Sequence, residues 1–270
     1  MTSLQEWIQA LPGDGHFTFT TAEARAQQPR ITAAGTEAAL GRASAAGLIA
    51  SPVRGFHVVL PLEDRRTGIP QWRLFLDPLM THLGLRYYVG LLTAAAIHGA
   101  SAQIPQVVQV VAARQHRPIS LDRLRIEFVV RSRAADAPVV TVTTPTGYLR
   151  VATCEVVALD LVRYPDQGGG WGNILTVLRD LAPQLTRAGT KAALALQPTG
   201  PELQRLGHLL DRAGAAASAG VLEQALVPRR LGWVSLDPGA PASEGEASRN
   251  RDATRDSRWR VIVNVDVTAD

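Results

Sequence analysis

Arginine, hydroxyl and amide side chains are concentrated in a short stretch near the start of the chain. Residues 24–60 contain four arginines and one acidic residue, Glu37, which leaves a local excess of three positive charges. Guanidinium groups bind phosphate oxygens, and hydroxyl and amide groups bind phosphates or base edges. The side chains that we expect to contact DNA here are Gln28, Arg30, Thr32, Thr36, Arg42 and Arg54.

Short helices followed by a hairpin are expected to position these side chains. The expected helices cover residues 4–11, 22–27 and 33–46, and the expected strands cover residues 17–20, 48–49 and 56–60. Thr20 and Glu23 have the spacing of a capping box, and Thr32 is placed to cap the third helix. Gly47 follows that helix where a terminating glycine is common.

This order of elements is typical of a winged helix-turn-helix domain, which we predict for residues 1–60. In such a domain the start of the third helix enters the major groove, where Thr32 and Thr36 would meet base edges. Arg54 lies at the predicted hairpin tip and would reach the minor groove or the backbone, and the other residues of the set would contact phosphates. The alternative is a small helical cap on a larger domain.

The rest of the chain is predicted to form a larger mixed α/β domain, which makes the whole an α+β protein. Residues 61–71 are polar and contain glycine and proline, and are predicted to be a linker; the second domain covers residues 72–270. Helices are expected over residues 74–83, 88–98, 154–163, 174–181, 191–196, 202–212 and 216–226, and strands over 107–111, 125–130, 139–143, 147–151 and 258–267. Residues 239–257 are expected to be a flexible surface loop.

A second basic region lies between Arg114 and Arg133. It contains six arginines against Asp122 and Glu127. Additional DNA contacts are predicted from Arg114, Arg117, Arg131 and Arg133. A nuclease is a weaker alternative, because the chain has a single lysine, Lys191, far from these carboxylates; Glu127 is more simply an ion-pair partner of the flanking arginines.

No catalytic, cofactor or metal site is predicted. The single cysteine, Cys154, cannot form an internal disulfide, and the six histidines show no pairing at metal-ligand spacing. The glycine-rich segment 168–173 lacks the Gly-Lys-Ser/Thr continuation of a phosphate-binding loop and is predicted to be a connection.

Composition limits the possible classes of protein. Hydrophobic residues make up 46% of the 270 residues and charged residues 19%, which is typical of a folded protein of one or two domains. No run of about 18 apolar residues is present, and the start lacks the pattern of a signal peptide, so a cytoplasmic location without membrane contact is expected. The net charge of +4 favours a polyanionic partner.

Four ordered stretches resemble the antitoxin family of the AbiE systems, which are type IV toxin–antitoxin systems described as predicted regulators of viral defence. They are residues 46–59 (AGLI…RGFHVV), residues 87–107 (YYVGLLTAAAIHG…PQV), residues 144–162 (TPTGYLRVAT…ALDLV) and residues 259–264 (WRVIVN). The resemblance implies a non-enzymatic protein whose N-terminal winged helix binds inverted repeats in its own promoter and represses the operon.

The resemblance also implies a functional partner. In the family, the C-terminal domain opposes a nucleotidyltransferase-like toxin encoded nearby, without need of a stable complex. We expect a monomer in solution that pairs on double-stranded DNA. The main alternative is a stand-alone transcription factor whose second domain binds a ligand or a protein.

Overall fold

A computed structural model describes residues 3–100, 107–240 and 255–267 of the chain. Most of the predicted flexible loop over 239–257 therefore lies outside the described residues. The chain divides into two compact units. One contains Met1–Val89, Gln106–Ala135 and Thr141–Val151; the other contains Gly90–Pro105, Asp136–Val140 and Ala152–Asp270. The domain boundary predicted around residues 61–71 does not coincide with a border of these units and stays a prediction.

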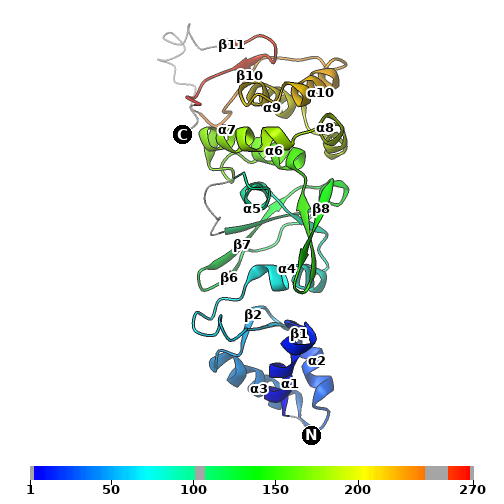
Figure 1. The fold of residues 1–270 in the computed structure, drawn as a ribbon, viewed down its shortest axis with the longest axis vertical. Helices are drawn as coiled ribbons and strands as arrows, with labels where there is room; N and C mark the ends of the chain where they lie inside the picture. The colour runs from blue at the N-terminus through cyan, green and yellow to red at the C-terminus, as the bar shows by residue number, and fades with distance from the viewer. Residues whose placement is uncertain (1–2, 101–106, 241–254, 268–270) are drawn as a thin grey trace. The chain divides into compact units, whose positions relative to one another are not determined.

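The first unit begins with helices and a small antiparallel sheet (Figure 1). The elements are α1 (Leu4–Ala10), the 3-10 helix η1 (Leu11–Asp14), β1 (Thr18–Thr20), α2 (Thr21–Gln27), α3 (Ala33–Ala45), β2 (Ile49–Val53) and β3 (Phe56–Val59). The strand order is β1-β3-β2, so the last strand lies in the centre and pairs with both others. The hairpin β2–β3 turns at Arg54 and Gly55.

Side-chain caps begin these helices where the sequence predicts. Thr20 and Glu23 form a capping box at α2, and the Thr32 hydroxyl accepts a hydrogen bond from the Gly35 amide at the start of α3. Gly47 follows α3 with φ of +66°, a conformation that glycine adopts without the steric cost of a Cβ. The predicted starts of α2 and α3 and the glycine that ends α3 are confirmed.

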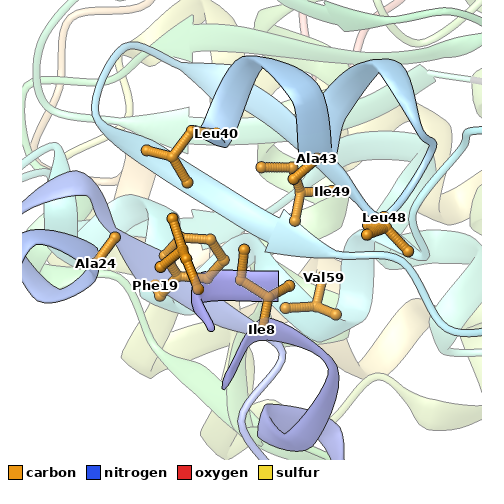
Figure 2. Close-up of a cluster of buried hydrophobic side chains, with 9 residues drawn as sticks. Ile8, Phe19, Ala24, Leu40, Ala43, Leu48, Ile49 and Val59 are labelled. Atoms are coloured by element: carbon orange, nitrogen blue, oxygen red, sulfur yellow. The ribbon is translucent and has the colours of Figure 1, made fainter. Parts of the chain in front are cut away.

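One hydrophobic cluster holds the N-terminal elements together. Figure 2 shows side chains of α1, α3 and the strands converging around Phe19. The buried members are Leu4, Ile8, Phe19, Ala24, Leu40, Ala43, Leu48, Ile49 and Val59. Helical spacing predicts that Ala39, Leu40, Ala43 and Ala46 form the inward face of this helix. Ala46 differs from this prediction, because it lies beyond the last residue of α3 and is exposed.

Most of a six-stranded mixed sheet also belongs to the first unit. Its strands are β4 (Tyr87–Val89), β5 (Val107–Ala112), β6 (Ile119–Leu121), β7 (Leu124–Val130), β8 (Val139–Thr144) and β9 (Gly147–Ala152), in the order β6-β7-β5-β4-β9-β8. Helix α4 (Trp72–His82) precedes β4, and the 3-10 helix η2 (Ala134–Asp136) follows β7. Strand β5 pairs with β7 in parallel and with β4 in antiparallel orientation.

The helix predicted over residues 88–98 is wrong in its first part. Tyr87, Tyr88 and Val89 form β4, and helix α5 begins only at Leu91 and ends at Ile97. All three strand residues are buried, because β4 lies inside the sheet between β5 and β9. A strand buried on both faces is continuously apolar and cannot be distinguished by periodicity from a buried helix.

The second unit is largely helical. Its helices are α5, α6 (Cys154–Arg163), α7 (Gly170–Leu181), η3 (Ala182–Gln184), α8 (Arg187–Ala193), η4 (Leu194–Leu196), α9 (Gly200–Arg212) and α10 (Ala216–Leu226). Helix α6 contacts α5, α7, α8 and α9, which explains why all but the last of its residues are buried. Its buried Glu155 accepts hydrogen bonds from the amide and hydroxyl of Thr186, the residue that caps α8.

A small sheet follows α10 in the chain and packs on α9. It consists of β10 (Val234–Ser235), β11 (Arg255–Asp256) and β12 (Val261–Ile262), in the order β10-β12-β11. The strand predicted over residues 258–267 is therefore mostly wrong. The Asp256 carboxylate accepts hydrogen bonds from the amides of Arg258 and Trp259, so residues 257–260 form a turn that an alternating pattern does not reveal.

Two glycine substitutions test the packing of the second unit. A Cβ at Gly207 in α9 would overlap the buried indole of Trp259, whereas a Cβ at Gly220 in α10 would meet open space. Gly207→Ala should lower the free energy of unfolding by about 1–3 kcal/mol. Gly220→Ala should raise it by about 0.5–1 kcal/mol, because alanine favours the helix. Urea denaturation measures both, and equal effects of the two substitutions would contradict the described packing of Trp259.

Candidate nucleic-acid interface

The exposed side of α3 faces a groove that the β2–β3 hairpin borders on the other side. The groove has a volume of about 750 Å³. It is lined by Thr21, Arg25, Glu37, Leu40, Gly41, Ser44, Ser51, Pro52, Val53, Arg54, Gly55 and His57. Within it, the Arg25 guanidinium of α2 pairs with the Glu37 carboxylate of α3 at 2.9 Å, and both side chains are largely exposed.

Four of the side chains predicted to contact DNA in the N-terminal segment lie on the surface. Arg30, Thr32, Arg42 and Arg54 are exposed. Arg54 lies at the hairpin tip and lines the groove, as the hairpin prediction requires. Arg42 lies on another side of α3, where it lines a second groove that α1 borders. Arg42 and Arg54 thus line different grooves on two sides of α3.

Two of the residues predicted to contact DNA are buried rather than on the surface. Thr36 is 1% exposed, and its hydroxyl donates to the Thr32 carbonyl at 3.3 Å. Gln28 is 7% exposed at the end of α2. Thr36 lies one turn before Leu40, so the apolar face that packs α3 into the core also carries Thr36 inward. Neither side chain is therefore available to a ligand on the surface.

The second basic region has a similar exception. Arg114, Arg117 and Arg133 are exposed, whereas Arg131 is 3% exposed and is therefore removed from the set of surface contacts. Arg114 donates a hydrogen bond to the Gly84 carbonyl, a neutral acceptor. The Arg125 guanidinium pairs with Glu127 at 2.7 Å, which confirms the expected role of that carboxylate as an ion-pair partner.

His57 is a central polar residue of the groove that sequence reasoning did not identify. Its Nε2 hydrogen-bonds with Thr21 Oγ1 at 2.9 Å and its Nδ1 with Ser51 Oγ at 2.8 Å, so one ring joins the start of α2 to the hairpin. The ring also stacks on Phe19. Burial, and then the nearby His82, lower the pKa of His57, so the neutral ring is favoured.

The Arg25–Glu37 pair was also missed, although both residues entered the charge count. They are twelve positions apart on different helices, and no spacing rule within a single helix connects them. The ion pair places a carboxylate on the exposed side of α3. Such a group accepts hydrogen bonds from the exocyclic amine of cytosine and repels phosphates.

Metal-ligating and nucleophilic side chains of the described residues can be compared with the requirements of such sites. Among them, no group of three or more histidine, cysteine and acidic side chains could hold a metal ion. Burial raises the pKa of Cys154 to about 11, which disfavours the thiolate that a nucleophile requires.

In the glycine-rich segment, the Asn173 amide donates to the Gly168 carbonyl next to the start of α7. Within the described residues, no helix is both long and apolar enough to span a bilayer.

Comparison with protein families identifies the class to which the chain is similar. Residues 88–212 match the model of the AbiEi antitoxin C-terminal domain, which confirms the resemblance to AbiEi-type antitoxins. The matched segment runs from β4 to the end of α9. This domain suggests the antitoxin of a toxin–antitoxin system, a class of proteins that is generally regulatory rather than enzymatic.

A solved structure extends the similarity in fold to nearly the whole chain. The crystal structure of the RV2827C protein from Mycobacterium tuberculosis superposes with a TM-score of 0.67 at 16% sequence identity, covering 97% of this chain and 91% of the other. At this identity the likeness concerns the fold alone. No curated protein matches the sequence.

The position of His57 predicts how stability depends on pH. Because its pKa in the folded state lies below the unfolded value of 6.5, the unfolded chain binds the proton more readily. Stability is then complete above pH 6.5 and falls as the pH drops from 6.5 toward the folded pKa. The loss is at most about 1.4 kcal/mol per pH unit.

The measurement is urea denaturation at several pH values between about 7.5 and 5.5, on the native protein and on His57→Gln. The native protein should lose more stability over this range than the variant, whatever their difference at neutral pH. Identical slopes would show that His57 does not control this dependence.

Proposed function

We propose that the chain is a DNA-binding autorepressor and antitoxin of an AbiE-like type IV system, with residues 1–60 forming a winged helix-turn-helix domain. The observation that carries the DNA-binding part is the chain order α1–β1–α2–α3–β2–β3 together with the strand order β1-β3-β2. Helices α2 and α3 then correspond to the helix-turn-helix, and the β2–β3 hairpin corresponds to the wing.

The surface chemistry supports double-stranded DNA as the ligand. The proposed contacts are Arg30 before α3, Thr32 at its start, Arg42 along it and Arg54 at the hairpin tip, all of which are exposed. The arginines would bind phosphates on both sides of α3 while the start of that helix lies in the major groove. Exposed Arg114, Arg117 and Arg133 are proposed as additional phosphate contacts.

The exposed side of α3 also explains why two copies are proposed to bind together. Several of its exposed positions are alanine or glycine, which carry no group that reads bases: Ala34, Ala38, Gly41 and Ala45. One chain would therefore bind weakly, and specificity would come from two monomers that pair on an inverted repeat in the promoter of the gene itself.

The antitoxin part of the proposal rests on the AbiEi C-terminal domain match over residues 88–212. We propose that this region opposes a nucleotidyltransferase-like toxin in the cytoplasm without a stable complex, in the context of phage defence. The protein is proposed to act without enzymatic activity, metal or cofactor.

The test of DNA binding is an electrophoretic shift with the DNA upstream of the gene, titrated with salt. The double variant Arg42→Ala, Arg54→Ala should bind that DNA at least tenfold more weakly than the native protein. Its dependence on salt should also be shallower, since each lost phosphate contact removes about 0.9 from the slope of log K against log salt.

A matched control removes the same charge elsewhere. Arg179 and Arg187 are exposed in the second unit, on α7 and α8, so the double variant Arg179→Ala, Arg187→Ala should bind the upstream DNA like the native protein. If the native protein binds the upstream DNA no better than a random duplex, autorepression is refuted. Equal losses in both double variants would indicate a general charge effect rather than a winged-helix contact.

The two proposed activities should be separable. If α3 and the hairpin serve only DNA binding, the Arg42→Ala, Arg54→Ala variant should lose repression of a reporter placed behind the promoter. It should still restore growth of cells that express the nucleotidyltransferase-like toxin of an AbiE-type operon. Loss of growth rescue in a folded variant, as judged by circular dichroism, would contradict the assignment of antitoxicity to the C-terminal region.

A further inference from the structure

An exposed tryptophan in the second unit lies beneath an arginine. Trp233 immediately precedes β10 and is 47% exposed. The Arg255 guanidinium lies 5.5 Å from the centroid of its ring. The strand register brings the two residues together, because Val234, next to Trp233, pairs with Val261, and Arg255 pairs with Ile262. An exposed indole that no apolar core requires is a surface that a ligand can cover.

Further exposed arginines lie close to Trp233 in the chain and in the small sheet. We define the Arg/Trp patch as Trp233 with the exposed arginines Arg229, Arg230, Arg255 and Arg260. Arg229 donates to the Pro198 carbonyl, and Arg260 donates to the Leu231 carbonyl. These bonds to backbone oxygens orient the guanidinium groups without neutralising them. Within residues 3–100, 107–240 and 255–267, no carboxylate forms an ion pair with any of these four arginines.

A neighbouring arginine differs from those of the Arg/Trp patch because carboxylates pair with it. Arg258 lies in the turn between β11 and β12 and binds the Asp211 and Glu223 carboxylates, each at 2.8 Å. Its guanidinium also lies over the buried ring of Trp259. This second arginine–tryptophan pair is thus neutralised and serves the packing of the turn on α9. The Arg/Trp patch has the same two residue types, but its ring is exposed and no carboxylate of the described residues forms an ion pair with its arginines.

We propose that the Arg/Trp patch binds single-stranded nucleic acid, with an unpaired base stacking on Trp233 and the adjacent phosphates contacting the arginines. Aromatic rings bind bases of any sequence by stacking, and arginines contribute both phosphate contacts and stacking. A duplex hides the faces of its bases inside the helix and offers only phosphates to this surface. The site is therefore distinct in its ligand from α3 and the hairpin.

The test measures binding of fluorescein-labelled dT12, U12 and a 12-base-pair duplex to the full chain by fluorescence anisotropy. All proteins carry Arg42→Ala and Arg54→Ala, which weakens the duplex binding proposed for α3 and the hairpin. Trp233→Ala should weaken binding of the single strands by roughly tenfold, the expected effect of losing one stacked base. Trp233→Phe should retain most of the affinity, because phenylalanine also stacks.

Tyr148→Ala is the matched control. Tyr148 is an exposed aromatic residue on β9 of the first unit, and its removal should leave binding unchanged. Quenching of intrinsic fluorescence by dT12 should decrease strongly in Trp233→Phe, which retains the other four tryptophans of the chain. Comparison of dT12 with U12 identifies which strand the patch prefers.

Single-strand affinity that is equal in Trp233→Ala and its parent would overturn the proposal. It would also be overturned if Trp233→Ala weakened duplex binding as much as single-strand binding, since the ring would then not distinguish unpaired from paired bases. Neither result depends on whether the upstream promoter is bound, so failure of this proposal is distinguishable from failure of the repressor proposal.

Discussion

The burial of one face of α3 is the constraint on which the chemistry of the first unit depends. Leu40 and Ala43 pack into the cluster around Phe19, which sets the rotation of the helix about its axis. Once that rotation is set, 3.6 residues per turn determine which other positions turn inward and which face solvent. Thr36 is buried by this geometry, whereas Glu37 and Arg42 are exposed. The residues available to a ligand therefore follow from where the apolar side chains lie.

The same dependence explains how much could be predicted from sequence. The capping residues Thr20 and Thr32 were predicted correctly, because a cap is a local interaction between residues three positions apart. Tyr88 and Val89 were predicted as helix because the identity of β4 depends on β5 and β9, which pair with it from distant parts of the sequence. The short strand β6 was not predicted at all, because three residues carry too little periodicity.

The candidate sites show a further limit, since charge counts do not reveal which charges are paired. Arg25 and Glu37 cancel each other on the surface beside the hairpin, so the local excess near α3 is concentrated in the remaining arginines. Arg258 is one of several arginines near the end of the chain, yet two carboxylates from α9 and α10 neutralise it. These partners are more than thirty positions away in sequence. Only the fold separates arginines that stabilise a turn from arginines that remain available to phosphates.

The two proposed nucleic-acid sites differ in the physical property that each would recognise. Helix α3 and the hairpin present arginines on two sides of the helix, a geometry that fits the spaced phosphates of a duplex groove. The Arg/Trp patch instead presents an aromatic face next to a short strand, and stacking requires a base whose own face is free. The phosphates of a duplex and of a single strand can both contact arginines. A paired base, however, offers no free face that could stack on the exposed ring. Trp233, rather than the arginines around it, is therefore the residue that would give the second unit a preference for unpaired strands.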